Sequence, residues 1–192
     1  DVVKIRDGIY RETVAPAKNP SPRRFRRAYI ATSLAFDRSM MTLLGRPVGD
    51  PSWTPETRAQ YLVAPEDPRY AELANRIVAT LPAELREDRV ARAIAITGDL
   101  GRRGTYSLRS RHAGAADPTA SFLFGDLTGY CVHFAHAAVY LLRAADVPAR
   151  LATGYQYPSK LRGRGSSLLL RGSDAHAWPE IYVHGAGWIV MD

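Results

Sequence analysis

Apolar residues recur at helical spacing through the middle of the chain. In residues 67–81 they fall at positions i, i+3, i+4 and i+7, and residues 86–104 repeat this pattern before glycines end it. The spacing predicts two amphipathic helices. Residues 130–150 are apolar almost all round as far as Pro148, which predicts a buried helix that ends before this proline.

Other segments, most of them in the last third of the chain, have the shorter period of β-strands. Alternating or strand-like patterns predict strands at residues 1–15, 105–110, 149–157, 167–172, 175–183 and 188–192. Proline and small polar residues predict loops at 15–24, 111–129 and 158–167, and residues 26–45 fit a strand or a helix equally well. Helices followed by strands predict an α+β fold in which helices pack against an antiparallel sheet.

Composition narrows the class of protein. The chain has 192 residues and a net charge of +7, and it contains no apolar run of the roughly 20 residues that a membrane span requires. Its abrupt ends are typical of a piece of a longer protein. Arginines supply most of the positive charge but are scattered, so we expect a solvated surface and no nucleic-acid partner. The basic segment 158–167 weakly favours acidic substrates.

The single cysteine is the first candidate for chemistry. Cys131 comes where a glycine-containing loop runs into the predicted buried helix, and helix N-termini favour the nucleophilic thiolate form of cysteine. The histidines at 133 and 136 project about 200° and 140° around the helix from residue 131, so neither readily faces the thiol. This divergence also argues against a metal site, and we predict neither a metal nor a cofactor.

His176 is the better partner for Cys131, because His112 and His184 lie in polar segments that predict solvent exposure. In the predicted hairpin, a loop of three residues at 184–186 would place Asp192 diagonal to His176 on one face of the sheet, at roughly 7–8 Å between backbones. A loop of two or four residues would place Asp192 on the opposite face. Asp174 and Glu180 are the alternative third groups.

These residues lie in segments that resemble a known family. The stretches GYCVHFAHAAVYLLRAADVPARLATGY and DAHAWPEIYVHGAGWIVMD resemble the transglutaminase-like superfamily of papain-type thiol enzymes, with a cysteine opening a buried helix and later H-A-W and G-W-x-x-x-D motifs. Cys131, His176 and Asp192 match its nucleophile, base and orienting acid. Asp146 departs from the pattern, since the family usually has glycine there.

The resemblance extends upstream and defines the predicted domains. Residues 60–192 resemble the soluble domain of bacterial membrane-anchored transglutaminase-like proteins, which leaves residues 1–59 as an N-terminal extension. The implied location is periplasmic, on a membrane-anchored parent. Tyr106 is the candidate side-chain donor to the oxyanion, and packing at a strand end is the alternative role for this residue.

The implied activity is acyl transfer from an amide through a thioester on Cys131. We expect a peptide or protein substrate, which includes cell-wall peptides. Hydrolysis, as in a cysteine protease or amidase, is the favoured reaction, and transfer to an amine, as in a protein-glutamine transglutaminase, is the alternative. A binding module that has lost catalysis is disfavoured because all three site residues are present. The sequence does not indicate an oligomeric state.

Overall fold

The structure is a computed structural model that describes residues 2–6, 9–14, 31–36, 38–156 and 172–192. The chain divides into two compact units, residues 1–38 with 155–175, and residues 39–154 with 176–192. The predicted loops at 15–24 and 158–167 lie entirely outside the described residues, as does most of the strand predicted at 167–172. The predicted domain boundary at residue 60 stays a prediction.

The first unit contains an antiparallel sheet of three strands in the order β1-β2-β3. These strands are β1 (Val2–Arg6), β2 (Ile9–Val14) and β3 (Ala31–Phe36). Strand structure in residues 1–15 is therefore confirmed. Residues 26–45, which fit either a strand or a helix, contain β3 and the 3-10 helix η1 (Met40–Leu43).

The second unit contains the helices, and the three predicted from apolar spacing are all present. The α-helices are α1 (Pro55–Gln60), α2 (Pro68–Ala79), α3 (Arg89–Arg103), α4 (Pro118–Leu123) and α5 (Cys131–Ala144). Short 3-10 turns are η2 (Ala83–Leu85) and η3 (His112–Gly114), with η5 (Gly172–Asp174) at the end of the other unit. No helix in the described ranges is long and apolar enough to cross a membrane.

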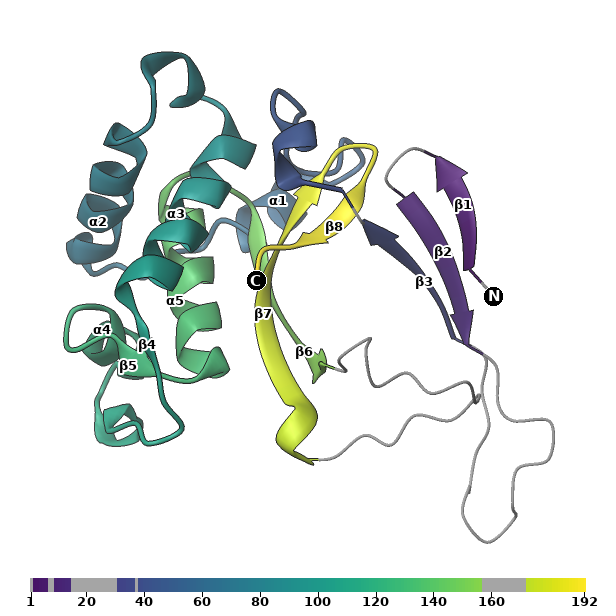
Figure 1. The fold of residues 1–192 in the computed structure, drawn as a ribbon. Coiled ribbons are helices and arrows are strands. Elements are labelled where there is room, and N and C mark those ends of the chain that lie inside the picture. The colour runs from purple at the N-terminus through teal and green to yellow at the C-terminus, as the bar shows by residue number, and fades with distance from the viewer. Residues whose placement is uncertain (1, 7–8, 15–30, 37, 157–171) are drawn as a thin grey trace, which may run out of the picture. The chain divides into compact units, whose positions relative to one another are not determined.

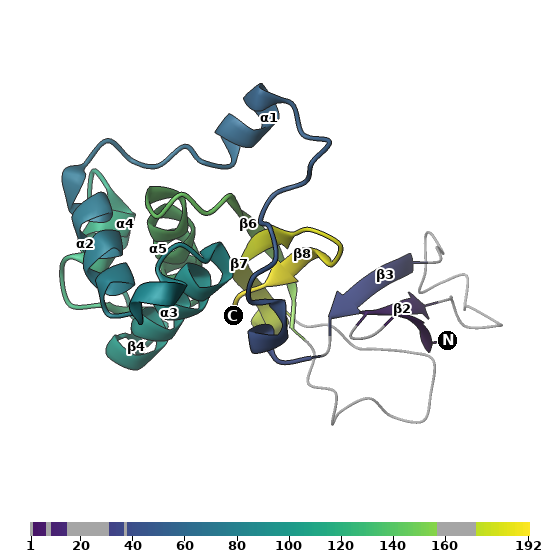
Figure 2. The ribbon, with the colours of Figure 1, turned by 90° about the horizontal axis from the view of Figure 1, so that it is seen from above.

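Helix α5 lies at the centre of this unit. It packs against α2, α3 and α4, and Figures 1 and 2 show these three helices around it, with β7 and β8 beyond. Its apolar residues are buried on nearly every side, as predicted, and include Ala135, Ala138, Val139, Leu141 and Leu142. Burying so much apolar surface fixes α5 in position, and with it the residue at its first position, Cys131.

The sheet of the second unit has the order β6-β7-β8. Its strands are β6 (Ala149–Tyr155), β7 (Ala175–Val183) and β8 (Gly187–Val190). Val183 pairs with Gly187, so the hairpin loop has three residues, as its predicted register requires. Gly187 has a φ of 88°, a conformation that glycine adopts without steric cost.

The prediction of a loop throughout residues 111–129 is wrong. This segment forms η3, α4 and the short strand β5 (Thr128–Gly129), which pairs in parallel with β4 (Thr105–Tyr106). Asp117 caps α4 by accepting a hydrogen bond from the backbone of Ala120, and Pro118 follows at the first helical position. Burial of Phe122 and Leu123 anchors this helix, so tertiary packing outweighs the turn-forming composition.

Candidate active site

Cys131 is the first residue of α5, and its surroundings fix how the chain enters the helix. His133, in the first turn, accepts a hydrogen bond at Nδ1 from the backbone N–H of Tyr130, at 3.3 Å. Gly129 lies so close to His133 that an added Cβ would lie 3.0 Å from its ring. A side chain at 129 would therefore displace the loop, which explains the glycine two residues before the cysteine.

His176 and Asp192 form a close pair. The distance from His176 Nε2 to Asp192 Oδ2 is 2.6 Å, and the side chains are 16% and 43% exposed respectively. An ionised carboxylate can only accept a hydrogen bond, so Nε2 carries the proton and donates a hydrogen bond to Asp192. This arrangement leaves the lone pair of the other ring nitrogen, Nδ1, available in the neutral imidazole.

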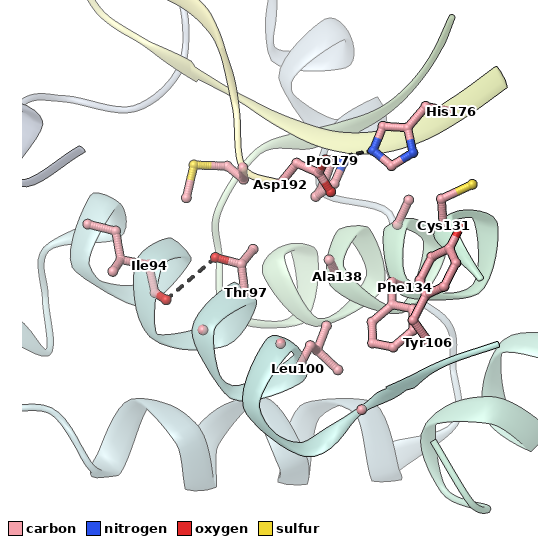
Figure 3. Close-up of a pocket in the computed structure, with 15 residues that line it drawn as sticks. Ile94, Thr97, Leu100, Tyr106, Cys131, Phe134, Ala138, His176, Pro179 and Asp192 are labelled. Atoms are coloured by element: carbon pink, nitrogen blue, oxygen red, sulfur yellow. Dashed lines mark hydrogen bonds and ion pairs between the residues drawn. The ribbon is translucent and has the colours of Figure 1, made fainter. Parts of the chain in front are cut away.

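One cavity of about 590 Å³ joins this pair to Cys131. Cys131, His176 and Asp192 all line it, and Figure 3 shows the free ring nitrogen of His176 on the side of Cys131. The half-buried thiol therefore shares a cavity with an imidazole that is already oriented by a carboxylate. The structure brings together the three residues that the sequence singled out.

Tyr106 lines the same cavity. The backbone N–H of Ser107 donates to the carbonyl of Gly129 at 2.6 Å, and this contact joins β4 to the loop before Cys131. The Tyr106 ring stacks on Phe134 with 6.4 Å between centroids, and the residue is 63% exposed. Its position near the thiol is compatible with donation to an oxyanion, and that role stays a prediction.

Glu180, an alternative third group in the sequence, has other partners. Its Oε2 accepts from Arg150 Nε at 2.8 Å, and its Oε1 accepts from Trp178 Nε1 at 2.9 Å. The indole of Trp178 in turn stacks beside His176, with ring centroids 5.9 Å apart. Sequence reasoning missed this Arg150–Glu180–Trp178 network, although charged and aromatic residues at alternate positions of one strand were a signal for it.

The other histidines lie away from the His176–Asp192 pair. Burial, and after it the neighbouring His112, lowers the pKa of His133, and burial lowers the pKa of His136. His184 is exposed, as predicted. The prediction of solvent exposure for His112 is wrong: this residue is 5% exposed, and its ring bonds to Ser121 Oγ at 3.0 Å and to the carbonyl of Thr128 at 2.9 Å.

Comparison with known proteins decides the family. The profile of the Transglutaminase-like superfamily matches residues 71–192, which is more than half of the chain. The chain belongs to this superfamily. A protein-glutamine gamma-glutamyltransferase of Pseudomonas aeruginosa is 41% identical over 87 residues, covering 45% of this chain but only 13% of the transferase.

Solved structures agree with the fold. The periplasmic domain of TgpA from Pseudomonas aeruginosa superposes with a TM-score of 0.60 and 33% identity, over 73% of this chain and 48% of that one. A proposed cysteine protease from Cytophaga hutchinsonii gives a TM-score of 0.51 at 23% identity, over 73% and 43% of the two chains. The match thus covers about half or less of the length of these relatives.

The departure of Asp146 from the family pattern has a conformational explanation. Asp146 has a φ of 60°, in the left-handed region where glycine is unstrained and where aspartate is among the more tolerated residues. Arg89 forms an ion pair with its carboxylate and donates from Nε to its carbonyl at 2.8 Å. These contacts hold the turn after α5 with aspartate in place of glycine.

Proposed function

We propose that this chain is the catalytic domain of a thiol acyl-transfer enzyme that acts on amide bonds. Cys131 is the nucleophile, His176 the general base and Asp192 the acid that orients the histidine. The observation that supports these roles is the 2.6 Å contact between His176 and Asp192 in the cavity that Cys131 also lines. A nucleophile, a base and an orienting group in this order are the components of such a site.

The reaction follows from the positions of the protons. Nδ1 of His176 takes the thiol proton of Cys131, and the sulfur attacks the carbonyl carbon of the substrate. The resulting imidazolium returns its proton to the nitrogen of the leaving amine as the C–N bond breaks, which leaves a thioester on Cys131. Asp192 accepts from Nε2 throughout, so it keeps the correct tautomer and stabilises the imidazolium.

The tetrahedral intermediate needs donors for its oxyanion. The backbone N–H of Cys131 lies in the first turn of α5, where it has no acceptor within the helix, and the positive end of the helix dipole lies there too. Tyr106, at the rim of the same cavity, is the proposed side-chain donor. Such preorganised donors stabilise the transition state more than the ground state.

The second half of the reaction depends on the acceptor. Attack of water on the thioester gives a peptidase or amidase, and this is the reaction that we favour from the resemblance to papain-type enzymes. Attack of an amine gives a transglutaminase. The similarity to a protein-glutamine gamma-glutamyltransferase over 87 residues supports this second candidate.

The location and the substrate class are part of the same proposal. The crystallised domain of TgpA is periplasmic, which supports a periplasmic location for this chain on a membrane-anchored parent protein. The substrate would then be a peptide or protein with an accessible amide, and cell-wall peptides are included in this class.

Trapping of the acyl-enzyme tests the proposal. The protein is incubated with a glutamine-containing peptide, or with the corresponding activated ester, and the mass of the intact chain is measured after acid quenching. We expect an adduct on Cys131 that is absent in Cys131→Ser and much reduced in His176→Ala. Addition of a primary amine then distinguishes the acceptors, since a transferase forms the amide product and a hydrolase forms the acid. The proposal would be refuted if none of the substrates gave a thioester on Cys131.

A further inference from the structure

The cavity that contains Cys131 is polar only at one end. Away from Cys131, His176 and Asp192, it extends between α3 and α5, on the side of Pro179, as Figure 3 shows. The remaining side chains of its lining are almost all apolar, and they include Ile94, Leu100, Phe134, Ala135, Ala138 and Met191. The thiol of Cys131 thus opens onto this apolar part of the cavity, which we call the chamber.

The one side-chain hydroxyl in this deeper part already uses its donor. Thr97 Oγ1 donates to the carbonyl of Ala93 at 3.0 Å, within its own helix. Thr97 Oγ1 can still accept one bond from a ligand donor, but other polar groups of a ligand would leave water without a side-chain partner there, and such burial is unfavourable. An apolar group would lose only its contact with water, and its burial is favourable. The lining selects for apolar ligands.

Two glycines on α3 keep this chamber open. Gly98 and Gly101 follow Ile94 by four and seven residues and so share its face of the helix, and both line the cavity. A Cβ at Gly101 would meet no atom within 4 Å, and one at Gly98 would meet only the end of the Arg102 side chain at 3.3 Å. Close packing therefore does not require glycine at either position.

Glycine is also the least favourable residue in a helix interior apart from proline. Alanine at 98 and 101 would fit and would favour the helix. Both positions line the cavity, Gly101 on its exposed side, so larger side chains there would narrow it. The two glycines weaken α3 and enlarge the chamber at the same time. Glycines that weaken a helix and keep a cavity open are expected where the cavity binds a ligand.

We propose that this chamber binds an apolar side chain of the acyl-donor substrate, adjacent to the reacting amide, and that Gly98 and Gly101 set how large this side chain can be. The inference rests on the proposed function, because the chamber opens directly onto Cys131 and His176. The whole cavity, chamber and catalytic end together, has a volume of about 590 Å³, within the roughly 300–1,000 Å³ of ligand pockets. Aromatic and large aliphatic side chains are therefore the expected occupants.

Two alkylating reagents that differ in one apolar group test the chamber. Cys131 is treated with iodoacetamide and with its N-phenethyl derivative, and each rate is divided by the rate with a free cysteine peptide. We expect the wild-type protein to favour the phenethyl reagent by about tenfold or more, which is the scale on which apolar pockets discriminate. G101L should abolish the preference, so that the two corrected rates become equal.

Matched variants make the result independent of folding. Ala71→Leu adds the same leucine to an exposed position of α2 and should keep the full preference. If G101L does not fold, the double variant Gly98→Ala/Gly101→Ala replaces it, since alanine favours the helix and still narrows the chamber. That variant should keep its fold and show a smaller preference than the wild type, because the two methyl groups fill part of the chamber.

Each outcome of the alkylation experiment either supports or overturns the inference. A wild-type protein without preference for the phenethyl reagent overturns it, as does a preference that is undiminished in both the leucine and the double alanine variants. If another part of the protein filled the chamber, the preference for the phenethyl reagent would also be absent, and the inference would be overturned in the same way. Failure of the proposed function is recognised separately, because then the iodoacetamide rate itself is the same in the wild type and in His176→Ala.

Discussion

Glu180 joins the guanidinium of Arg150 to the indole of Trp178, so its charge should affect both stability and the proposed catalytic histidine. Replacement by glutamine removes the charge and keeps the shape. One of the two bonds that Glu180 accepts, from Arg150 or from Trp178, is then lost or weakened, because the amide offers a single acceptor oxygen. The guanidinium of Arg150 keeps its contact with Trp188, 3.8 Å above the ring centroid.

The expected magnitude follows from the geometry. Arg150 Nη2 and Nε lie 2.7 and 2.8 Å from Glu180 Oε2, and the Glu180 side chain is only 11% exposed. Breaking a buried ion pair costs about 3–5 kcal/mol. The Arg150 side chain is 39% exposed, however, and water can resolvate part of its charge. We therefore expect Glu180→Gln to lower the free energy of unfolding by about 2 kcal/mol.

Urea unfolding measures this loss as a lower midpoint at an unchanged slope. A double-mutant cycle with Arg150→Met isolates the pair, for which we expect a coupling energy of about 1–2 kcal/mol. Because Trp178 stacks beside His176, kcat should fall by about tenfold or more while KM changes little, as expected for a displaced catalytic group.

Glu72→Gln is the matched control, since Glu72 is exposed on α2. Its change in unfolding free energy should stay within about 0.5 kcal/mol, as for ordinary surface substitutions. The reasoning is refuted if Glu180→Gln is as neutral as this control, or if the cycle yields no coupling between Glu180 and Arg150.

Substitutions at three further positions test the roles of Tyr106, Asp146 and His133. Tyr106→Phe should lower kcat by about 10²-fold or more if its hydroxyl serves the oxyanion, and an unchanged kcat would assign Tyr106 to packing alone. Asp146→Gly should change unfolding free energy by less than about 1 kcal/mol, because relief of the positive φ offsets loss of the exposed pair with Arg89, whereas Asp146→Val should be clearly destabilising. The lowered pKa of His133 means that its neutral form is favoured in the folded state, so stability should be lost as pH falls below about 6.5, the ordinary histidine value. Thermal unfolding at pH 7.5 and 5.5 should show a smaller decrease in His133→Asn than in the wild type, and equal decreases would contradict this assignment.

The elements that could be predicted are those with a strong local pattern. The apolar spacing of α2, α3 and α5 identified each helix within a few residues. The hairpin could be predicted in register as well, because a strand has a period of two and only an odd loop places Asp192 on the face of His176. The observed pairing of Val183 with Gly187 meets that condition.

The errors come from contacts that no local pattern specifies. Residues 111–129 have the composition of a loop, yet Phe122 and Leu123 pack into the core and fix α4; the Asp117–Pro118 pair was an available signal for the start of this helix. His112 has polar neighbours in sequence, and its burial depends on Thr128 and Ser121 from later elements. The network of Glu180 likewise requires Arg150 from the neighbouring strand.

The pH dependence of Cys131 alkylation shows whether His176 activates the thiol. Iodoacetamide rates are measured from pH 4 to 10 for the wild type and for His176→Ala, with the fold of both checked by circular dichroism. We predict rapid alkylation of the wild type well below the free-thiol midpoint of about 8.5, and a variant that reacts slowly until the pH approaches that value. Slow alkylation in both proteins, with the same midpoint near about 8.5, would contradict the claim that His176 activates Cys131.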